Sequence, residues 1–378
     1  MSITPKQNAA AGNVGAVTEI VLLGGSGDVG SRLEKLLSEN TKTVVTTVSR
    51  RTKAQADQFS DRVFHVSLDL TGDMKLAIPA DAVVVNLTEA TPPELVRQVI
   101  ATGGCFLETS ATPEYLNAIQ KAAEGATGPG SAVLCVGVAP GLTNLLAAEI
   151  EAKYPKTVQI DIGLEMGLGR HYGAAATEWF LRTAGQIYPA TINGRSETFA
   201  AGQLKRKFAF REKGRPRHSI GYGFVDQEII ARSAGQQLKT VRSFVALDPP
   251  WITRVLAILL AMGLGTVMAR YSRRLALGML RLPAFGRVRT RVIAEGFDVA
   301  GHLTGQVRVA TGDQAQATAV MILATIQAIM GQCGPDRRGL TTITDHLSLD
   351  AALAALGQLL PETRVKTVLP TDLRGQTG

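Results

Sequence analysis

The sequence predicts an α/β fold, in which a doubly wound parallel sheet is combined with a second, mixed α/β domain. Three observations lead to this fold class. A glycine-rich turn at residues 24–30 lies between an apolar run and a helical pattern, and five or six strand–helix repeats occupy residues 19–152. The chain has 378 residues, which exceeds the usual size of one domain and favours two.

The glycine turn predicts a nucleotide site. Residues 20–23 form a continuous apolar run, as in a strand buried on both faces of a parallel sheet. Glycines let the backbone approach a pyrophosphate, and the N-terminus of the following helix offers N–H groups to it. The context is that of a Rossmann-type dinucleotide-binding domain, with a purely structural turn as the alternative. The expected cofactor contacts here are Gly24, Gly25, Ser26, Gly27, Asp28, Val29 and Gly30.

The end of the second expected strand, residues 43–48, indicates which dinucleotide binds. An NAD site tends to carry an acidic residue here, which holds the ribose 2′-hydroxyl. This chain instead has Ser49, Arg50 and Arg51, a hydroxyl and two guanidinium groups that suit a 2′-phosphate. We therefore predict NADP(H) as the cofactor, although a pair of solvated arginines after a strand is the alternative.

Two further strand ends complete the predicted cofactor site. Asp69 closes the third expected strand, residues 63–70, where it would contact the adenine. Asn86, Leu87 and Thr88 close the fourth and would border the nicotinamide, because ligands of such sheets bind at the carboxyl ends of strands.

Three segments of the chain resemble the saccharopine dehydrogenase-like oxidoreductases. They are "GGSGDVGSRL", "VVVNLTEATPPELVRQVIATGGCFLETSATPEYL" and "VGVAPGLTNLLAAEI". Glu108 stands where the family usually has Asp in an Asp-Thr-Ser-like turn. The resemblance covers residues 18–150 and implies an NAD(P)-dependent oxidoreductase that transfers hydride at a C–N or C=N bond of an amino-acid-like substrate; with residues 49–51, we expect it to use NADP(H).

The resemblance also implies a split architecture, which the sequence accommodates. We expect a flexible arm at residues 1–18, a Rossmann domain at 19–152 and an inserted substrate or dimerisation domain at 153–312. Residues 313–378 would form C-terminal helices that pack on the Rossmann domain. Within the inserted domain, alternating patterns predict several strands and a helix near residues 174–188.

Candidates for an acid or base are few. His171 and Tyr172 lie between an expected strand and the helix that follows, so we take them as catalytic candidates, with a loop histidine and a packed tyrosine as the alternative. His218 and Tyr222 are weaker candidates. Convergent carboxylate-binding arginines would have to come from Arg170, Arg182 and Arg195. The three cysteines show no metal-ligand spacing, and we expect no metal.

The net charge of +8 is concentrated in one window. Residues 249–294 carry eight arginines and no Lys, Asp or Glu, and Val255–Ala269 forms an uncharged, apolar helical pattern. Three interpretations remain open for residues 251–291: a helix pair buried in the domain core or a dimer interface, a peripheral contact with an anionic membrane, and a membrane span. The second would suit a reductase of a hydrophobic carbonyl, imine or alkene.

Composition sets further limits. Aromatic residues make up 5% of the chain and the basic excess is local, so we expect no nucleic-acid partner. The first residues lack the pattern of a signal peptide. We expect a homodimer in the cytoplasm that binds a small-molecule substrate, with membrane association as the alternative location. A non-catalytic NADPH-binding sensor or scaffold is the remaining alternative.

Overall fold

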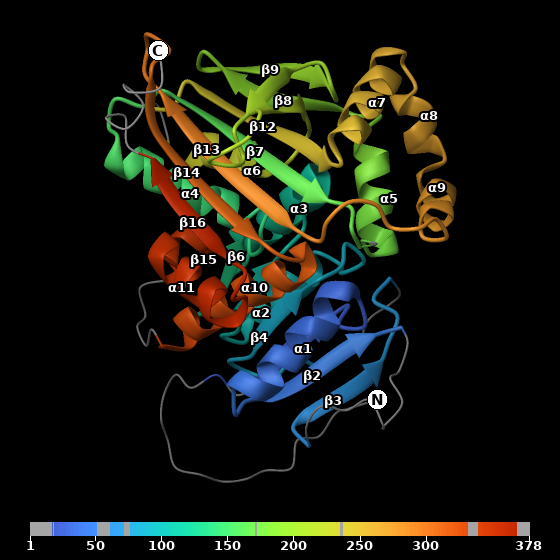
Figure 1. Cartoon of the computed structure of the whole chain (residues 1–378). Coiled ribbons are helices and arrows are strands. Elements are labelled where there is room, and N and C mark those ends of the chain that lie inside the picture. The colour runs from blue at the N-terminus through green and yellow to red at the C-terminus, as the bar shows by residue number, and fades with distance from the viewer. Residues whose placement is uncertain are drawn as a thin grey trace. The chain divides into compact units, whose positions relative to one another are not determined.

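The computed structural model describes residues 17, 19–50, 61–71, 76–170, 172–234, 237–331 and 339–368. These residues fall into two units (Figure 1). Unit 1 contains residues 1–137 and 318–348, and unit 2 contains residues 138–317 and 349–378. The expected boundary at residue 152 lies near the end of α4 (Leu142–Lys153), whereas the units divide before this helix.

Unit 1 is built on a seven-stranded parallel sheet with the order β15-β6-β5-β4-β1-β2-β3. The order reverses between β1 and β4, and in such sheets ligands bind at the carboxyl edge beside this switch point. The predicted Rossmann-type fold is confirmed. The strands are β1 (Glu19–Leu23), β2 (Val44–Ser49), β3 (Val63–Ser67), β4 (Val83–Asn86), β5 (Cys105–Glu108), β6 (Ser131–Leu134) and β15 (Gly339–Thr342).

Helices of unit 1 follow the strands as the repeats predicted. They are α1 (Asp28–Asn40), α2 (Glu94–Ala101) and α3 (Pro113–Glu124), together with most of α10 (Gln314–Gly331) and the short η2 (Ile343–Asp345). The strands β1 and β4 are almost wholly buried, which explains why their sequences are continuous apolar runs. Among the described helices, α10 alone has the length and composition to cross a membrane, and its middle is buried as in the core helix of a soluble protein.

Unit 2 contains a mixed nine-stranded sheet. Seven strands follow the order β10-β11-β12-β7-β13-β14-β16, and the β8–β9 hairpin joins at β12. The strands are β7 (Gln159–Gly167), β8 (Ile187–Ile192), β9 (Arg195–Ala200), β10 (Lys205–Phe208), β11 (Arg217–Gly221), β12 (Thr240–Asp248), β13 (Thr290–Phe297), β14 (Leu303–Thr311) and β16 (Arg364–Val368). Its helices are α4, α5 (Ala174–Thr183), α6 (Asp226–Ser233), α7 (Pro250–Ala261), α8 (Gly265–Arg270), α9 (Ser272–Met279) and α11 (Leu349–Leu359).

Two helix predictions for unit 2 were wrong. The helix expected to reach residue 188 ends at Thr183, and its last expected residues belong to β8. The apolar pattern 255–269 is not one helix, because α7 ends at Ala261 and Gly263 adopts a positive φ of 78° before α8 begins. A residue in this left-handed region ends a helix, and glycine adopts it without strain.

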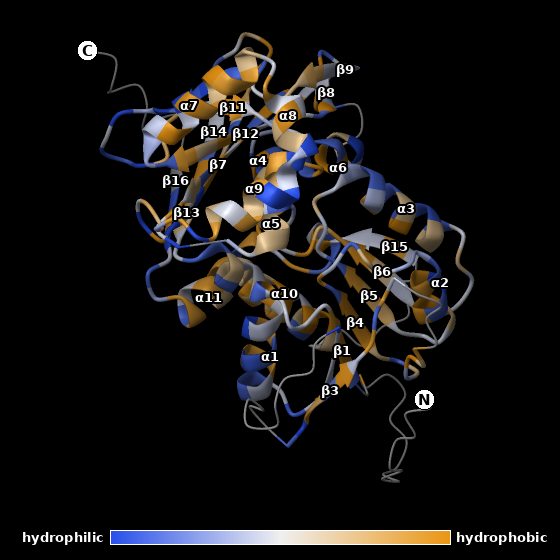
Figure 2. Cartoon of the chain, turned by 90° about the vertical axis from the view of Figure 1, so that its right-hand side faces the viewer, coloured by the Kyte–Doolittle hydropathy of each residue, from blue (hydrophilic) through white to orange (hydrophobic). Residues whose placement is uncertain are grey.

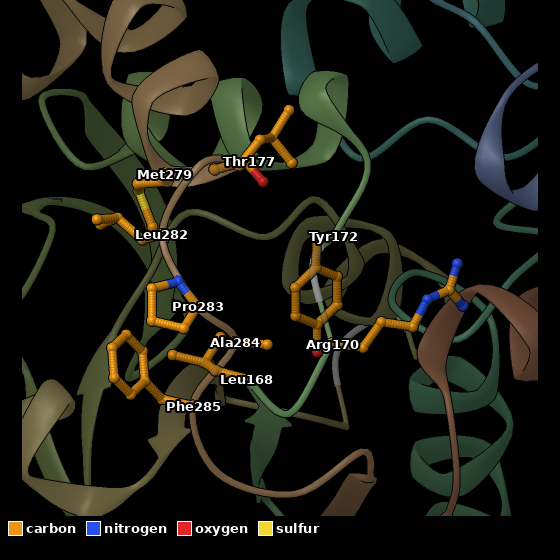
Figure 3. Close-up of a pocket in the computed structure, with 10 residues that line it drawn as sticks. Leu168, Arg170, Tyr172, Thr177, Met279, Leu282, Pro283, Ala284 and Phe285 are labelled. Atoms are coloured by element: carbon orange, nitrogen blue, oxygen red, sulfur yellow. The ribbon is translucent and has the colours of Figure 1, made fainter.

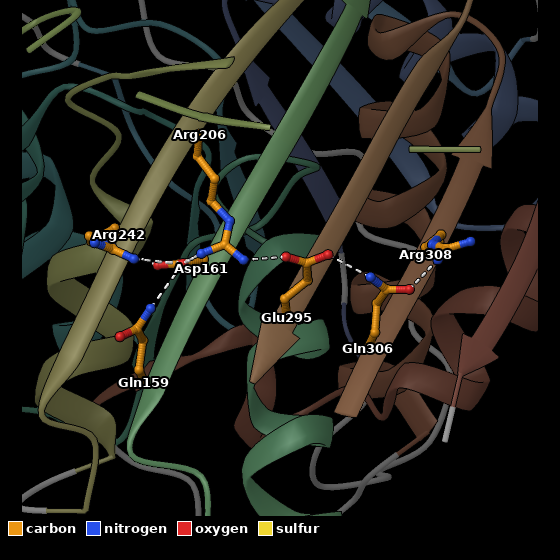
Figure 4. Close-up of polar contacts among 7 residues, drawn as sticks. All are labelled: Gln159, Asp161, Arg206, Arg242, Glu295, Gln306 and Arg308. Atoms are coloured by element: carbon orange, nitrogen blue, oxygen red, sulfur yellow. Dashed lines mark hydrogen bonds and ion pairs between the residues drawn. The ribbon is translucent and has the colours of Figure 1, made fainter. Parts of the chain in front are cut away.

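One face of the unit 2 sheet carries a network of buried charges (Figure 4). Asp161 on β7 is fully buried and accepts two hydrogen bonds of 2.7 Å from the guanidinium of Arg242. Arg206 bridges Asp161 to Glu295, with 2.6 Å to the second carboxylate. Gln306 donates to Glu295 at 2.5 Å. Each of these carboxylates is paired with a guanidinium, which offsets the cost of placing a charge in the interior.

Candidate functional site: the carboxyl edge of the parallel sheet

The glycine turn is shaped by contacts that side chains would obstruct. Gly24 has a φ of 84°, and its N–H donates to the carbonyl of Val48 at 2.8 Å. A Cβ on Gly25 would lie 2.3 Å from Cγ2 of Thr47, and a Cβ on Gly30 would lie 2.5 Å from Cα of Gly25. The turn therefore has to be glycine at three positions for α1 to pack against β1 and β2.

The open side of the turn faces away from these contacts. Gly27 occupies the N-cap position of α1, and a Cβ there would meet a single nearby atom, the carbonyl oxygen of Gly24 at 3.3 Å. The first N–H groups of a helix have no partner within the helix, and the N-terminal end of the dipole favours an anion. Asp28 in the first turn pairs with Arg32 at 3.3 Å, which offsets its negative charge. This cradle fits a pyrophosphate.

Ser49 and Arg50 lie where the sequence placed them, at the carboxyl end of β2. Ser49 is buried and Arg50 is exposed, while Arg51 lies outside the described residues. The pKa of the exposed Asp69 carboxyl is lowered by hydrogen bonds from the backbone N–H and the hydroxyl of Thr71, and also by the charge of Arg50. Arg50 and Asp69 are therefore close enough to interact, so part of the Arg50 charge is balanced within the site.

The loop after β4 lies against the glycine turn. The N–H of Leu87 donates to the carbonyl of Leu23 at 2.9 Å, continuing the β1–β4 pairing. A Cβ on Gly24 would lie 3.1 Å from Cβ of Thr88. The structure thus brings together two of the segments that the sequence assigned to the cofactor, the turn at 24–30 and the loop at 86–88.

Asn86 is fully buried, and its side chain holds other residues. Its amide donates to Oε2 of Glu108 at 2.7 Å and to the hydroxyl of Tyr115 at 3.0 Å, and its oxygen accepts from Thr91 at 2.7 Å. The Tyr115 hydroxyl donates to the carbonyl of Thr91 at 2.8 Å. Asn86, which was predicted to border the nicotinamide, therefore uses its side-chain amide within the protein, where it positions the ends of β4 and β5.

Glu108 is the titratable centre of this network. Its Oε1 also accepts from the N–H of Ser110 at 2.7 Å. Burial raises the pKa of the Glu108 carboxyl to about 7, against the effect of its hydrogen bonds. Burial also raises the pKa of Tyr115, with a further contribution from the charge of Glu108. A carboxyl that titrates near neutral pH at the carboxyl edge of the sheet can hold or release a proton there.

The sequence analysis did not select Glu108 or Tyr115 as functional residues. A signal was present, because the apolar strands "VVVN" and "CFLE" each end in a polar residue, Asn86 and Glu108, and the two residues are register partners in adjacent parallel strands. Tyr115 lies on α3, seven residues further on, and no pattern predicted its approach to Asn86.

Tyr172, one of the catalytic candidates of unit 2, lines an apolar pocket. It encloses about 100 Å³ and is lined mainly by Leu168, Tyr172, Met279, Leu282, Pro283 and Phe285. Figure 3 shows the ring of Tyr172 opposite the apolar side chains and the guanidinium of Arg170 turned away from them. The Tyr172 hydroxyl donates to the carbonyl of Gly167 at 3.1 Å, and burial raises its pKa above the ordinary value. His171 lies outside the described residues.

Among the other described polar candidates, Arg170 also lines this pocket, but its guanidinium is turned away from the apolar side chains (Figure 3). Arg170 pairs with Asp313 at 2.7 Å, and Arg195 is exposed in the β8–β9 hairpin. Tyr222 is fully buried, stacks on Phe180 with ring centroids 4.7 Å apart and donates to its carbonyl, which makes it a core residue. His218 is exposed on β11. In the described part of the chain, no three His, Cys, Asp or Glu side chains gather as metal ligands would.

Comparison with known proteins identifies the fold. No protein-family model and no curated protein matches the chain. Among solved structures, it is similar to apo saccharopine dehydrogenase (L-Glu forming) from Saccharomyces cerevisiae, with a TM-score of 0.59, 15% identity, and coverage of 93% of this chain and 100% of that one. The chain has the saccharopine dehydrogenase-like fold.

Two further solved structures are similar at lower TM-scores. The DAP dehydrogenase of C. glutamicum in complex with DAP has a TM-score of 0.45 at 14% identity and covers 97% of this chain and 100% of its own. An engineered D-amino acid dehydrogenase bound to NADP+ has a TM-score of 0.44 at 15% identity and covers 96% of this chain and 100% of its own. The fold assignment rests on saccharopine dehydrogenase alone.

Proposed function

We propose that the protein is an NADP(H)-dependent oxidoreductase whose cofactor binds at the carboxyl edge of the unit 1 sheet. The glycine turn carries this proposal, because its buried side excludes a Cβ at Gly25 and Gly30 while its open side leaves the start of α1 accessible at Gly27. When bound, the nicotinamide supplies or accepts the hydride. The chain's own residues bind the pyrophosphate, orient the ring and exclude water.

Selection of NADP(H) over NAD(H) is assigned to the end of β2. Ser49, Arg50 and Arg51 would hold the 2′-phosphate, since a guanidinium forms charge-assisted hydrogen bonds to phosphate oxygens. The nearby carboxylate of Asp69 partly balances Arg50, so we expect a preference of about 10- to 100-fold, or 1.4–2.8 kcal/mol, and no absolute discrimination.

Calorimetric titration with NADPH and with NADH tests this proposal. The wild type should bind NADPH more tightly, and Arg50→Ala should lose most of the difference while leaving the affinity for NADH nearly unchanged. Lys35→Ala, which replaces an exposed cation on α1, is the matched control. Equal affinity for the two cofactors would refute the 2′-phosphate assignment, and absence of binding to either would refute the oxidoreductase assignment.

Two substrate classes remain candidates. The fold supports hydride transfer at a C–N or C=N bond of an amino-acid-like substrate, which would need arginines that bind carboxylates. The apolar pocket beside Tyr172 instead favours a hydrophobic carbonyl, imine or alkene, because Arg170 is turned away from it and paired with Asp313. We expect NADPH oxidation with apolar carbonyl, imine or alkene compounds and slower oxidation with keto acids plus amines.

Steady-state kinetics on both compound classes separate these candidates. Leu282→Asp puts a charge at the rim of the apolar pocket, where the wild-type side chain is 56% exposed. This variant should raise the KM for a hydrophobic substrate and leave NADPH affinity unchanged. An unchanged KM would exclude the pocket as the substrate site. Tight NADPH binding without turnover of either class would instead support a non-catalytic sensor or scaffold.

A further inference from the structure

The segment of three short helices α7, α8 and α9 exposes apolar side chains to an unusual degree. Among the described residues, sixteen large apolar side chains are exposed, and twelve of them lie between residues 251 and 288. Burial of this whole segment in the domain core, one part of the first interpretation, is therefore wrong, while a dimer interface stays a prediction. In α7, only Thr253 and Leu256 are buried. The twelve exposed residues are Trp251, Val255, Ile258, Met262, Val267, Tyr271, Leu275, Leu277, Met279, Leu282, Phe285 and Val288.

Exposed arginines are interspersed with these apolar residues. The segment carries Arg254, Arg270, Arg273, Arg274, Arg281 and Arg287, all exposed, and none of them makes an ion pair within the described residues. No Lys, Asp or Glu occurs between residues 249 and 294. Figure 2 shows α7 largely in the hydrophobic colour, with hydrophilic residues in α8 and α9. We call residues 250–288 the apolar-basic segment.

The concentration of exposed apolar side chains in this one segment indicates an interaction surface. Contiguous exposed apolar patches on soluble proteins are rarely larger than a few hundred Å² and otherwise mark interaction sites. The segment cannot span a bilayer, because the 12 residues of α7 extend about 18 Å against a hydrocarbon core of about 30 Å. The length and composition of the apolar-basic segment instead suit helices that lie along an interface.

Charge decides which interface fits. In a symmetric dimer the same segment of both copies would meet, and because it contains no Asp or Glu, it would offer its six exposed arginines no opposite charge. An anionic lipid surface reverses this: the apolar side chains enter the boundary between headgroups and acyl chains, and the arginines contact phosphates. Trp251 and Tyr271 suit this boundary, because aromatic rings with a polar edge concentrate there.

We propose that the apolar-basic segment binds the surface of an anionic lipid membrane as a peripheral attachment. This inference goes beyond the oxidoreductase function and does not depend on it. The apolar pocket of unit 2 is lined in part by residues 279–285, so part of its lining belongs to this same segment. A hydrophobic compound held in the membrane would then meet the protein at residues that also line a pocket.

Vesicle flotation of the full-length protein tests the proposal. We expect binding to phosphatidylcholine vesicles that contain phosphatidylglycerol, and binding at least tenfold weaker to phosphatidylcholine alone. Salt at about 1 M shortens the Debye length to about 3 Å and should release most of the bound protein. Absence of vesicle binding, or equal binding to both vesicle types, would overturn the proposal.

Two pairs of variants locate the surface. Each arginine near an anionic surface contributes about a fivefold change in affinity, so Arg273→Ser with Arg274→Ser should weaken binding about 25-fold. Lys205→Ser with Lys207→Ser, two exposed cations on β10, is the matched control and should change binding much less. Equal effects of the two pairs would show that general positive charge binds the vesicles, which contradicts a dedicated segment.

A second pair of double variants tests the contribution of the apolar side chains to vesicle binding. Ile258→Ser with Met262→Ser removes side chains that are 59% and 68% exposed, so the fold should be retained while flotation is reduced at least tenfold. Ile187→Ser with Val299→Ser changes side chains that are 71% and 88% exposed elsewhere in unit 2 and should leave binding intact. If the first pair instead dissociates a dimer in solution and the wild type ignores vesicles, the segment is a protein interface and the proposal is refuted.

Discussion

Replacing Glu108 with glutamine should change how the stability of unit 1 depends on pH. Burial raises the pKa of this carboxyl from 4.5 to about 7. Each pKa unit corresponds to about 1.4 kcal/mol, so ionising Glu108 in the folded protein costs about 3 kcal/mol more than in the unfolded chain. Glutamine carries no titrating proton, so the variant lacks this cost at every pH.

The direction of the effect follows from proton binding. Below pH 4.5 the carboxyl is protonated in both states, and its contribution to stability is fully present. Between pH 4.5 and about 7 the unfolded chain releases the proton while the folded protein keeps it, so the free energy of unfolding falls as pH rises. The free energy of unfolding of the wild type, minus that of Glu108→Gln, should therefore fall by about 3 kcal/mol across this pH range. Above about pH 7 this difference should change little further.

Hydrogen exchange is the suitable assay, because both tryptophans, Trp179 and Trp251, lie in unit 2 and do not report on unit 1. Slowly exchanging amides of β4 and β5 give the free energy of opening at each pH, after correction for intrinsic exchange. Tyr115→Phe keeps the carboxyl and should retain the wild-type pH dependence. If the difference in opening free energy between wild type and Glu108→Gln stayed constant with pH, the argument that burial raises the pKa of Glu108 would be refuted.

Three further substitutions test the packing. Gly30→Ala should lower the free energy of unfolding by about 1–3 kcal/mol and weaken NADPH binding, because the new Cβ would overlap the backbone of Gly25. Thermal unfolding with and without NADPH measures both effects. NADPH binding as tight as in the wild type would contradict the close approach of Gly30 to Gly25. A Cβ on Gly357, in α11, would meet no atom within 4 Å, so Gly357→Ala should raise the free energy of unfolding in urea by about 0.5–1 kcal/mol. A lower free energy of unfolding would show that this position is crowded. Arg206→Met should destabilise unit 2 by about 3 kcal/mol in the same assay, since Asp161 and Glu295 lose the cation that they share. An unchanged free energy of unfolding would mean that Arg242 alone compensates the buried charge.

Local patterns predicted most of the parallel sheet. The run at residues 20–23, the glycines and the leucines that follow are all close in sequence, and they specify β1, the turn and α1 without knowledge of distant contacts. The same holds for β2 and β4, which are buried along nearly their whole length. The resemblance to the saccharopine dehydrogenase-like oxidoreductases likewise rested on contiguous segments, at residues 24–33, 83–116 and 136–150.

Long-range contacts account for what the sequence analysis missed. Glu108 approaches Asn86 across adjacent strands, 22 residues away, and Tyr115 reaches them from a helix. The ion pairs of Asp161 join strands separated by up to 81 residues. The exposure of the apolar α7 could not be predicted, because hydrophobic periodicity indicates an apolar face and does not state what covers it.

Hydrogen exchange of the wild type with and without NADPH tests the central claim most directly. The account predicts that NADPH slows exchange in peptides covering residues 24–31, where the helix N–H groups would bind the pyrophosphate, and residues 86–88, which lie against the same turn. Peptides of the apolar-basic segment should be unchanged. NADPH binding that leaves the 24–31 amides unprotected, or no protection anywhere in unit 1, would contradict a cofactor site at the glycine turn.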